Sequence, residues 1–372
     1  MHKNNKPIAK PDSQKKFKSY WSANPFKIYS HIPKLYEWYM GNDIYPISIE
    51  IGITSQCNHN CCWCSITPKK VDRHSYLSKD ILKKFVSNVK EMNVRSVVIS
   101  GSGEQTLHKD LPWFLQQLHE AGLYIGMNTN GSRLTPDLCR TIVDTVTWIR
   151  ISLDAASEEV RKAVHGVKDL NKATEGLKEL VRLKKEVDSQ ISIGTQMVVC
   201  PENEKEIESC TNLSIAIGVD YQQIKPAIPF DYYYPNYKDA KIRMAEWLDR
   251  IKNLDGNKQW KGFQVNVRYD QFENYINGTD FYERVNFKCL TSFSPYIEAD
   301  GNVWYCVDKK GNENYWLGDL NNHSLKEIWE SERRKEVLYY TNQNPCGHIC
   351  RNSPLNELLW EMKNPTPFYS FL

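Results

Sequence analysis

The chain has 372 residues and carries 48 lysines and arginines against 45 aspartates and glutamates, so its formal net charge of +3 gives no sign of a nucleic-acid-binding protein. Hydrophobic residues make up 41% of the chain, enough for one large domain and a smaller one, yet no apolar run approaches the roughly 18 residues of a membrane span. The N-terminus lacks the apolar stretch of a secretion signal, so the eleven cysteines favour metal ligation over disulfides and a reducing, cytoplasmic location.

The first 46 residues divide into two parts. Residues 1–19 are polar and rich in lysine, which is typical of a solvated tail. Residues 20–46 are rich in aromatic side chains and are interpreted as an N-terminal extension. Within it, the sequence predicts a short helix over Pro33–Met40 that packs on the outside of the main domain.

A strand is predicted immediately before a cluster of cysteines. Ile47, Ile49, Ile51 and Ile53 alternate with small or polar residues, so the four isoleucines share one face of the strand. We expect that face to pack on the core and the other face to meet water or line a polar cavity.

The strand leads into Cys57, Cys61 and Cys64, spaced C-x3-C-x2-C. Thiolates are the usual ligands of iron–sulfur clusters, and three of them leave one iron of a [4Fe–4S] cluster with an open position. A structural zinc site is the alternative, because closely spaced cysteine pairs are common in such sites. No Cys or His pair follows at the spacing of a zinc finger.

The chain then alternates strands with helices. Further strands are predicted at 96–100, 124–127, 148–153, 191–199 and 221–225, and helices at 77–92, 110–121, 135–146, 157–165, 171–187, 203–217 and 239–254. This alternation predicts a parallel sheet with functional groups at the C-terminal ends of its strands. A doubly wound sheet and a partial barrel both remain open, and the polar face of the first strand favours a barrel.

Polar residues follow these strands at their expected C-terminal ends. The turn Gly101–Glu104 (G-S-G-E) offers flexible backbone and an anionic acceptor, although a plain turn is the alternative. Ser152 and Asp154 share a face, with a helix N-cap as the alternative for Asp154. Gln196 interrupts an apolar strand and needs a hydrogen-bonding partner. Lys225 is either a substrate contact or a surface lysine.

The last third of the chain holds a second cysteine set. Segment 227–240, which comes before it, is rich in tyrosine and is interpreted as either a substrate lid or a packed connector. Residues 263–269 are predicted as a strand. Asp300-Gly301 between two strand-like runs predicts a hairpin. Four cysteines lie around and after it, enough for either a [4Fe–4S] cluster or a structural zinc: Cys289, Cys306, Cys346 and Cys350.

The first cysteine loop resembles the C-x3-C-x-aromatic-C signature of the radical S-adenosylmethionine (SAM) superfamily, with Trp63 as the aromatic residue. The resemblance implies a partial (β/α)6 barrel over roughly residues 45–250 and a [4Fe–4S] cluster on the three cysteines. The open iron of that cluster binds SAM, and cleavage of SAM yields a hydrogen-abstracting 5′-deoxyadenosyl radical.

The resemblance also implies roles for the strand-end residues. Trp63 lies near the adenine, and Gly101, Gly103 and Glu104 correspond to the G-G-E segment that contacts the SAM amino group, with Ser102 as a mild departure and without the proline that some members carry after the glutamate. Ser152 and Asp154 resemble ribose-contacting residues. Gln196 is interpreted as a contact to the SAM ribose or carboxylate, or as a structural hydrogen bond.

The C-terminal part resembles the auxiliary-cluster domain of the SPASM/Twitch group, carried by the hairpin with D-G-x-V-x-x-C and by the segments Trp316–Leu320 and Leu325–Trp329. Four cysteines resemble the shorter Twitch form with one extra [4Fe–4S] cluster. The expected fold is an α/β partial barrel plus a small β-hairpin and α-helical domain. Its parts are a tail over 1–19, an extension over 20–46, a radical SAM core over 47–254 and an auxiliary domain over 255–372.

These observations predict a cytoplasmic radical SAM enzyme that abstracts hydrogen from a small polar substrate of the sugar, aminocyclitol or aminoglycoside type. Oxidation and epimerisation both remain open, with Cys62 as a candidate hydrogen donor and Lys225 as a candidate substrate contact. The resemblance implies an electron donor such as flavodoxin or ferredoxin, and no nucleic-acid or membrane partner is expected. A peptide-modifying radical SAM enzyme and a non-catalytic metal-binding protein are the alternatives.

Overall fold

The computed structural model describes residues 24–64, 74–228, 234–255, 263–277, 289–290, 293–344 and 352–370. Three parts of the sequence predictions lie outside these ranges: the tail over 1–19, the tyrosines at 232 and 233 in the aromatic segment, and the cysteines Cys346 and Cys350. The three cysteines of the first loop and the first half of the auxiliary cysteine set are described.

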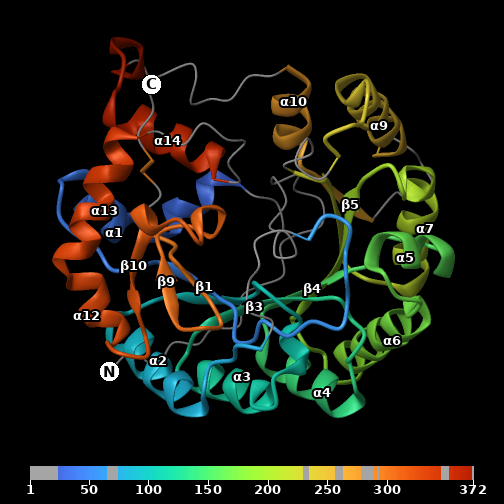
Figure 1. Ribbon diagram of the computed structural model, residues 1–372, viewed down its shortest axis with the longest axis horizontal. Helices are drawn as coiled ribbons and strands as arrows, with labels where there is room; N and C mark the ends of the chain where they lie inside the picture. Colours follow the sequence, from blue (N-terminus) through green and yellow to red (C-terminus); the bar gives the residue numbers. More distant parts are fainter. Residues whose placement is uncertain are drawn as a thin grey trace.

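A single curved sheet of ten strands organises the described residues (Figure 1). Its order is β10-β9-β8-β1-β2-β3-β4-β5-β6-β7, and neighbours from β8 through to β7 pair in parallel. The strands are β1 (Ser48–Ile51), β2 (Ser96–Ile99), β3 (Tyr124–Thr129), β4 (Trp148–Ser152), β5 (Ser192–Val199), β6 (Tyr221–Pro226), β7 (Gln264–Val267), β8 (Tyr296–Ile297), β9 (Asn302–Trp304) and β10 (Trp316–Asp319).

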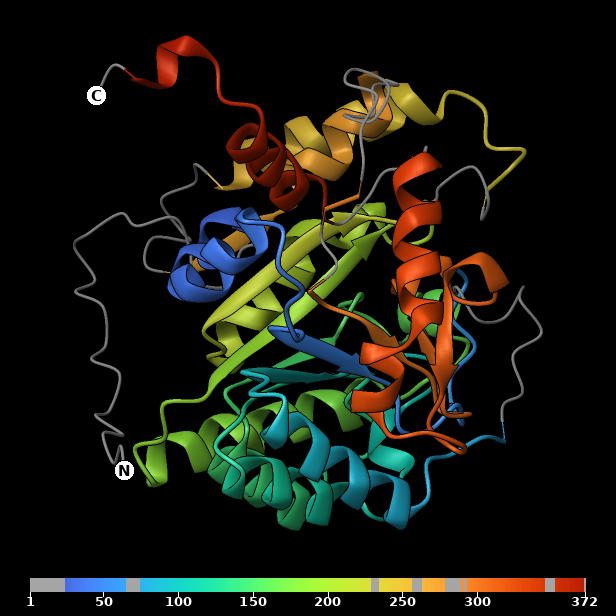
Figure 2. The same cartoon turned by 90° about the vertical axis from the view of Figure 1, so that its left-hand side faces the viewer.

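Helices cover the outer face of this sheet and close its two ends (Figures 1 and 2). Those that follow β1 to β6 form the outer layer: α2 (Lys79–Glu91), α3 (Leu111–Glu120), α4 (Pro136–Thr145), α5 (Glu158–His165), α6 (Leu170–Glu186), α7 (Ile207–Ile217) and α9 (Ala240–Asp255). The others are α1 (Ile32–Tyr39), α10 (Tyr269–Asn277), α12 (Leu325–Glu330), α13 (Glu332–Gln343) and α14 (Ser353–Lys363).

Local side chains fix where several helices begin and end. The hydroxyls of Ser78, Thr135 and Ser157 accept the backbone N–H groups at the starts of α2, α4 and α5, which would otherwise lack partners. Gly166 and Gly218 end α5 and α7 in the left-handed conformation that glycine tolerates best. These ends set the lengths of the loops that carry the site.

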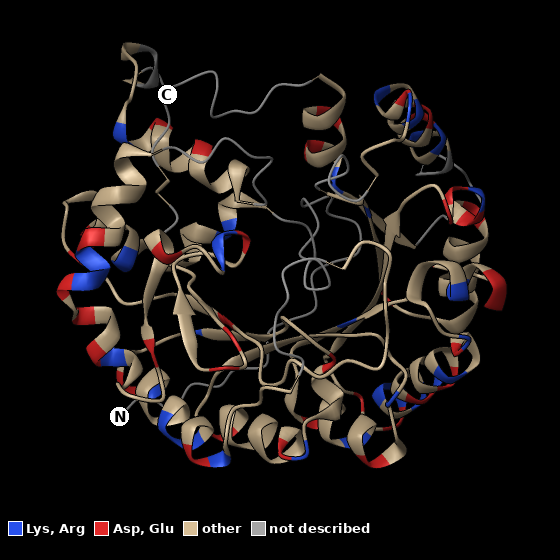
Figure 3. Ribbon diagram, viewed as in Figure 1, with Lys and Arg blue, Asp and Glu red and all other residues tan. Residues whose placement is uncertain are grey.

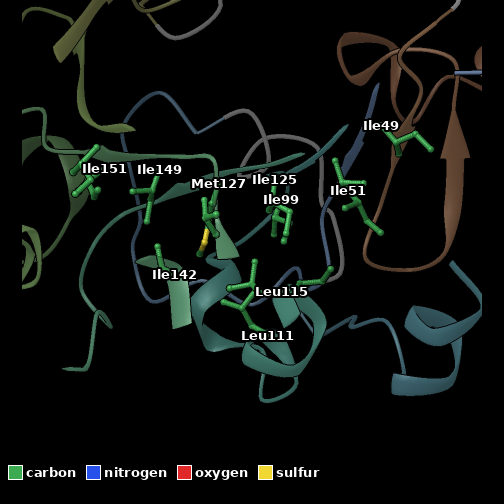
Figure 4. Packing of buried hydrophobic residues seen from close by; sticks show 14 of the residues in the cluster. Ile49, Ile51, Ile99, Leu111, Leu115, Ile125, Met127, Ile142, Ile149 and Ile151 are labelled. Atoms are coloured by element: carbon green, nitrogen blue, oxygen red, sulfur yellow. The ribbon is translucent and has the colours of Figure 1, made fainter. Parts of the chain in front are cut away.

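The core lies between the sheet and its outer helices. Figure 4 shows Ile99, Ile125 and Met127 of β2 and β3 pointing toward Leu111 and Leu115 of α3. Ile49, Ile51 and Ile53 lie in the same core and are buried, as the alternation predicts, whereas Ile47 is buried in a separate small core. Residues between them point to the concave face, where Glu50 lines a cavity. The strand periodicity therefore separates an apolar outer layer from a polar interior.

The auxiliary region continues the core sheet rather than standing apart from it. β8 pairs in parallel with β1, matching Tyr296 to Glu50 and Ile297 to Ile51. The predicted hairpin follows as β8 and β9, which pair antiparallel, with Gly301 at positive φ in the connection. A separate small core joins Leu35 of α1 and Leu359 of α14 to Phe293, so the N-terminal extension packs against the end of the chain as well.

The structure confirms the predicted α/β fold with a parallel sheet and a C-terminal hairpin and helices. Helix α10 was not predicted, because β7 is short and its polar residues hide the change to helical spacing.

Charged side chains concentrate on the outer helices (Figure 3). Within the described ranges, no helix has the length and apolar character needed to cross a membrane.

Candidate active site

A cavity of about 620 Å³ opens on the concave side of the sheet. Most of its lining comes from β1 to β6 and from the loops at their C-terminal ends, which is where parallel α/β folds carry their sites, and the rest comes from the segments after β7 and β9. Ten of the sequence-predicted site residues line it: Cys57, Cys61, Trp63, Cys64, Gly101, Gly103, Glu104, Ser152, Asp154 and Gln196. Lys225, the candidate substrate contact, also lines it and is half-buried.

The three cysteines of the first loop converge on one wall of this cavity. Burial raises the pKa of the Cys61 thiol well above its usual range, and the nearby Asp154, Cys64 and Cys57 add to this shift. Backbone hydrogen bonds from Asn60 N–H to His165 O (2.9 Å) and from Cys62 N–H to Val164 O (3.0 Å) tie the loop to the end of α5. The donor set is therefore three thiols held close together on an anchored backbone.

The G-S-G-E turn passes directly beneath the cysteine loop. A Cβ on Gly103, whose φ is +115°, would lie 2.6 Å from the backbone oxygens of Thr54 and Gln56, so only glycine allows this approach. Glu104 N–H donates to Gln56 O at 2.7 Å. Gln105 stands where related members carry proline, and its side-chain oxygen accepts Ile53 N–H at 2.6 Å. The turn and the cysteine loop are thus one connected unit.

Glu104 is buried and holds the ends of two strands together. Its carboxylate accepts the hydroxyls of Thr106 and Thr129, both at 2.6 Å, and the N–H of Asn130 at 2.7 Å. These bonds fix the carboxylate at the cavity wall between β2 and β3. Three of the four donors, including Thr106 N–H at 3.1 Å, go to Oε1, so Oε2, which accepts Asn130 N–H, retains capacity for a cationic donor from the cavity.

A buried histidine–carboxylate network surrounds Cys61. His165 Nδ1 lies 3.2 Å from Cys61 Sγ, and its Nε2 lies 3.1 Å from Asp154 Oδ2. Burial lowers the pKa of His165. The other oxygen of Asp154 accepts Val198 N–H at 2.6 Å, so this carboxylate does not cap α5, which begins instead at Ser157.

Arg161 joins that network to the strand ends. It is fully buried, pairs with Asp169 at 2.9 Å and donates to the carbonyls of Ser152, Leu153 and Asn130. Burial by itself would raise the pKa of Asp169, but hydrogen bonds from His59 and Arg161 lower it to about 2. Arg161 therefore holds the C-terminal ends of β3 and β4 in place.

Polar side chains form a row across the inner face of the sheet. Ser152 pairs in register with Gln196, and Gln196 with Gln223, on three neighbouring strands. One layer lower, Arg150 donates to Asn128 at 3.2 Å and to Gln223 at 2.7 Å. All of these residues line the cavity, so its floor beyond the cysteines is polar and carries a cation.

Cys62 points into a different environment from the other loop cysteines. It is described but does not line the cavity. The Tyr234 hydroxyl oxygen lies 3.4 Å from its sulfur and donates its proton to Glu202 at 2.7 Å. A hydrogen bond from Cys200 is the main cause that lowers the pKa of Cys62. Cys62 and Tyr234 thus connect the loop to the β5–α7 region.

Cys289 and Cys306 are the two described members of the second cysteine set, and both are partly exposed. The Tyr305 hydroxyl donates to Cys289 O at 3.3 Å, which links the two segments. Val307 and Asp308, immediately after Cys306, line the main cavity. The hairpin therefore carries the Cys306 segment to the edge of the candidate active site.

Sequence reasoning missed several residues of the site. Arg150 and Gln223 could have been found, because they alternate with Ser152 and Lys225 on predicted strands and so share their face. His165 lies at the end of a helix, and only the fold brings it to Cys61. Glu298 and Lys310, from the auxiliary region, meet Ser102 only through long-range contacts.

Comparison with known proteins agrees with this geometry. The model of the radical SAM superfamily matches residues 51–213, and the model of the SPASM iron–sulfur cluster-binding domain matches residues 289–352. The tungsten-containing aldehyde ferredoxin oxidoreductase cofactor-modifying protein of Pyrococcus furiosus is 24% identical over 76% of this chain and 80% of that protein. The probable GTP 3′,8-cyclase of Sulfurisphaera tokodaii is 25% identical over 71% of this chain and 82% of that protein.

The fold has solved counterparts. Streptococcus suis SuiB, in a crystal structure bound to the precursor peptide SuiA, matches with a TM-score of 0.64 and 14% identity. The match covers 91% of this chain and 76% of that chain. At this identity the likeness supports the fold alone.

The fold, the cysteine loop and the two matched domains together define an enzyme of the radical SAM type. The chain belongs to the radical SAM superfamily and carries a SPASM-type iron–sulfur domain. This domain pair implies three cofactors: a SAM-binding [4Fe–4S] cluster, an auxiliary cluster and SAM. The residues present fit the first cluster, because three converging thiols on an anchored loop are the donor set it requires.

Proposed function

We propose that this enzyme abstracts a hydrogen atom from a small polar substrate and that the outcome is oxidation of the substrate. The observation that carries the proposal is the polar floor formed by Asn128, Arg150 and Gln223, which faces the same cavity as the three loop cysteines. When bound, the cluster and SAM supply a 5′-deoxyadenosyl radical for the abstraction. A one-electron donor such as flavodoxin or ferredoxin is part of the proposal.

The residues of this chain would bind and orient both molecules. Cys57, Cys61 and Cys64 would hold the cluster, and Glu104 would receive the SAM amino group. Trp63 would lie against the adenine, while Ser152, Asp154 and Gln196 would position the ribose and carboxylate. Positioning of this kind places the reacting C–H bond and excludes competing groups.

The remaining polar groups of the cavity support a polar substrate. Gln271 lines the cavity, and its buried side-chain oxygen has no partner within the described ranges. Such an orphaned acceptor costs about 1–3 kcal/mol, so it favours a ligand that donates a hydrogen bond. Arg150 and Lys225 add cations at the floor. The names of the two sequence relatives, a GTP cyclase and a cofactor-modifying protein, also favour a small anionic or polar molecule.

Two observations favour oxidation over epimerisation. Epimerisation needs a hydrogen donor facing the substrate, whereas the Cys62 thiol lies outside the cavity lining and is hydrogen-bonded to Tyr234. The segment after Cys306 borders the cavity through Val307 and Asp308. The position of this segment supports an electron acceptor near the Cys306 side of the cavity, which the removal of a second electron would need.

The test is substrate-dependent formation of 5′-deoxyadenosine by the anaerobically reconstituted enzyme with SAM and a reductant. Glycosides, aminocyclitols and nucleotides form one panel, and short peptides form the other. We expect stimulation by a member of the first panel, with a carbonyl product two hydrogens lighter. Stimulation only by peptides would replace this proposal with a peptide-modifying function, and an inverted product of unchanged mass would replace oxidation with epimerisation.

A further inference from the structure

A buried polar cluster joins the G-S-G-E turn of the core to the auxiliary region. Lys310 Nζ donates to Ser102 Oγ at 2.7 Å, and Ser102 Oγ donates to Glu298 Oε2 at 2.5 Å. Lys310 and Glu298 also form an ion pair of 3.4 Å. Ser102 is fully buried, and the side chains of Lys310 and Glu298 are 8% and 6% exposed. Three groups from distant parts of the sequence thus satisfy one another away from water.

Tyr296 makes a second contact from the auxiliary region to the same turn. Ser102 N–H donates to the Tyr296 hydroxyl at 3.3 Å. A Cβ on Gly101 would lie 2.4 Å from that hydroxyl, and a Cβ on Gly52 would lie 3.3 Å from it. Burial and the nearby Glu298 raise the pKa of Tyr296, so its hydroxyl stays protonated. Gly101 is therefore explained by Tyr296, which occupies the space that a side chain would need.

The turn needs such support because its own backbone is permissive. Gly101 and Gly103, with φ of +150° and +115°, flank Ser102, and glycine has the widest conformational freedom. Among the four residues of the turn, Ser102 is the one whose side chain reaches the auxiliary region. A buried ion pair adds little net stability compared with apolar packing, so its value here lies in fixing a position.

We propose that Glu298 and Lys310 are positioning residues of the SAM site, through which the auxiliary region holds the turn that orients SAM. The inference rests on the proposed function, which assigns Gly101, Gly103 and Glu104 to SAM. It goes beyond that function because the affinity for SAM would then depend on contacts from the auxiliary region as well as on the core. Neither Glu298 nor Lys310 needs to touch SAM: both act through Ser102.

The experiment measures the dissociation constant for SAM on the full chain, reconstituted anaerobically, by equilibrium dialysis. Lys310→Met keeps most of the side-chain volume but leaves Glu298 without its cation. Ser102→Ala removes the connection to the turn while leaving the ion pair intact. We expect SAM binding to weaken about tenfold or more in Lys310→Met and by a smaller factor in Ser102→Ala, within the range seen when outer partners of a site are removed.

Lys326→Met is the matched control. Lys326 of α12 pairs with Glu91 of α2 at 2.6 Å, so it also links the auxiliary region to the core, but on the surface and away from the turn. Iron content and thermal unfolding are measured on every variant, so that loss of fold is separated from loss of SAM affinity. If Lys310→Met fails to load iron, Ser102→Ala decides the question.

The outcomes separate the inference from the function on which it rests. Wild-type SAM affinity in loaded Lys310→Met and Ser102→Ala chains would overturn the inference and leave the proposed function intact. Equal weakening in Lys326→Met would also overturn it, because any link between the two regions would then have the same effect. A loaded wild-type chain that does not bind SAM would overturn the proposed function itself.

Discussion

The two cysteine sets of this protein are built in opposite ways. In the core, Cys57, Cys61 and Cys64 lie on one loop, which is anchored to α5 and to the turn beneath it. In the auxiliary region the cysteines are spread over 289–350, and the hairpin β8–β9 brings the Cys306 segment to the cavity. The comparison shows that a local sequence pattern brings the first set together, whereas the sheet extension at β8 positions the Cys306 segment.

The largest expected effect separates the two sets directly. The Cys57/Cys61/Cys64→Ala variant should lose all SAM cleavage and retain about four of about eight irons per chain, because only the auxiliary ligands remain. The variant with all four auxiliary cysteines changed to Ala should retain the first cluster. Iron and sulfide analysis after anaerobic reconstitution measures both. About four irons in the wild type and none in the core variant would show that the second set holds no [4Fe–4S] cluster.

The next prediction concerns the scaffold of the core set. Arg161→Met should destabilise the protein by about 3–5 kcal/mol, because it leaves Asp169 without its buried cation and three carbonyls without their donor. Urea unfolding of the apoprotein measures this. Arg182→Met is the control. Among the described residues Arg182 pairs with Glu179 and Glu186 at the surface of α6, so no measurable change is expected. A similar loss in both variants would show that burial of Arg161 has no special role.

A smaller effect is expected where the turn meets the cysteine loop. Gly103→Ala should cost about 2–3 kcal/mol and reduce iron loading, because its Cβ would collide with the backbone of residues 54–56. Gly122→Ala shares a positive φ but meets open space, and it should cost about 1 kcal/mol without changing iron content. Thermal unfolding and iron analysis on the two variants test the difference. Equal iron content in both would mean that the loop tolerates displacement.

The features of the fold and the site that depend on local residue spacing could be predicted from the sequence. Alternation in the first strand correctly placed Ile49 and Ile51 in the core and Glu50 at the cavity, and the repeated strand–helix pattern led to a parallel sheet with polar residues at its C-terminal ends. The C-x3-C-x2-C spacing brought three thiols to one wall. Each of these follows from periodicity or from the geometry of a short loop.

Contacts between distant segments were beyond such reasoning. Ser102 meets Lys310 across 208 positions, and His59 meets Asp169 across 110. The local sequence around these residues does not indicate which distant residue each one contacts, because each is a polar residue in a loop or beside a glycine. The extension of the core sheet through β8 has the same origin: a two-residue strand is too short to show alternation.

The smallest expected effect tests the one cysteine of the first loop that faces away from the cavity. Cys62→Ala should change SAM cleavage and product formation by less than about twofold, because the Cys62 side chain lies outside the cavity lining and packs, partly buried, against the core. Its partner gives a matched variant, Tyr234→Phe, which keeps the ring but removes the bonds to Cys62 and Glu202. Product yield and deuterium incorporation from solvent are measured on both. A Cys62→Ala enzyme that still abstracts hydrogen but no longer returns it would establish Cys62 as a hydrogen donor, and the proposed oxidation would give way to epimerisation.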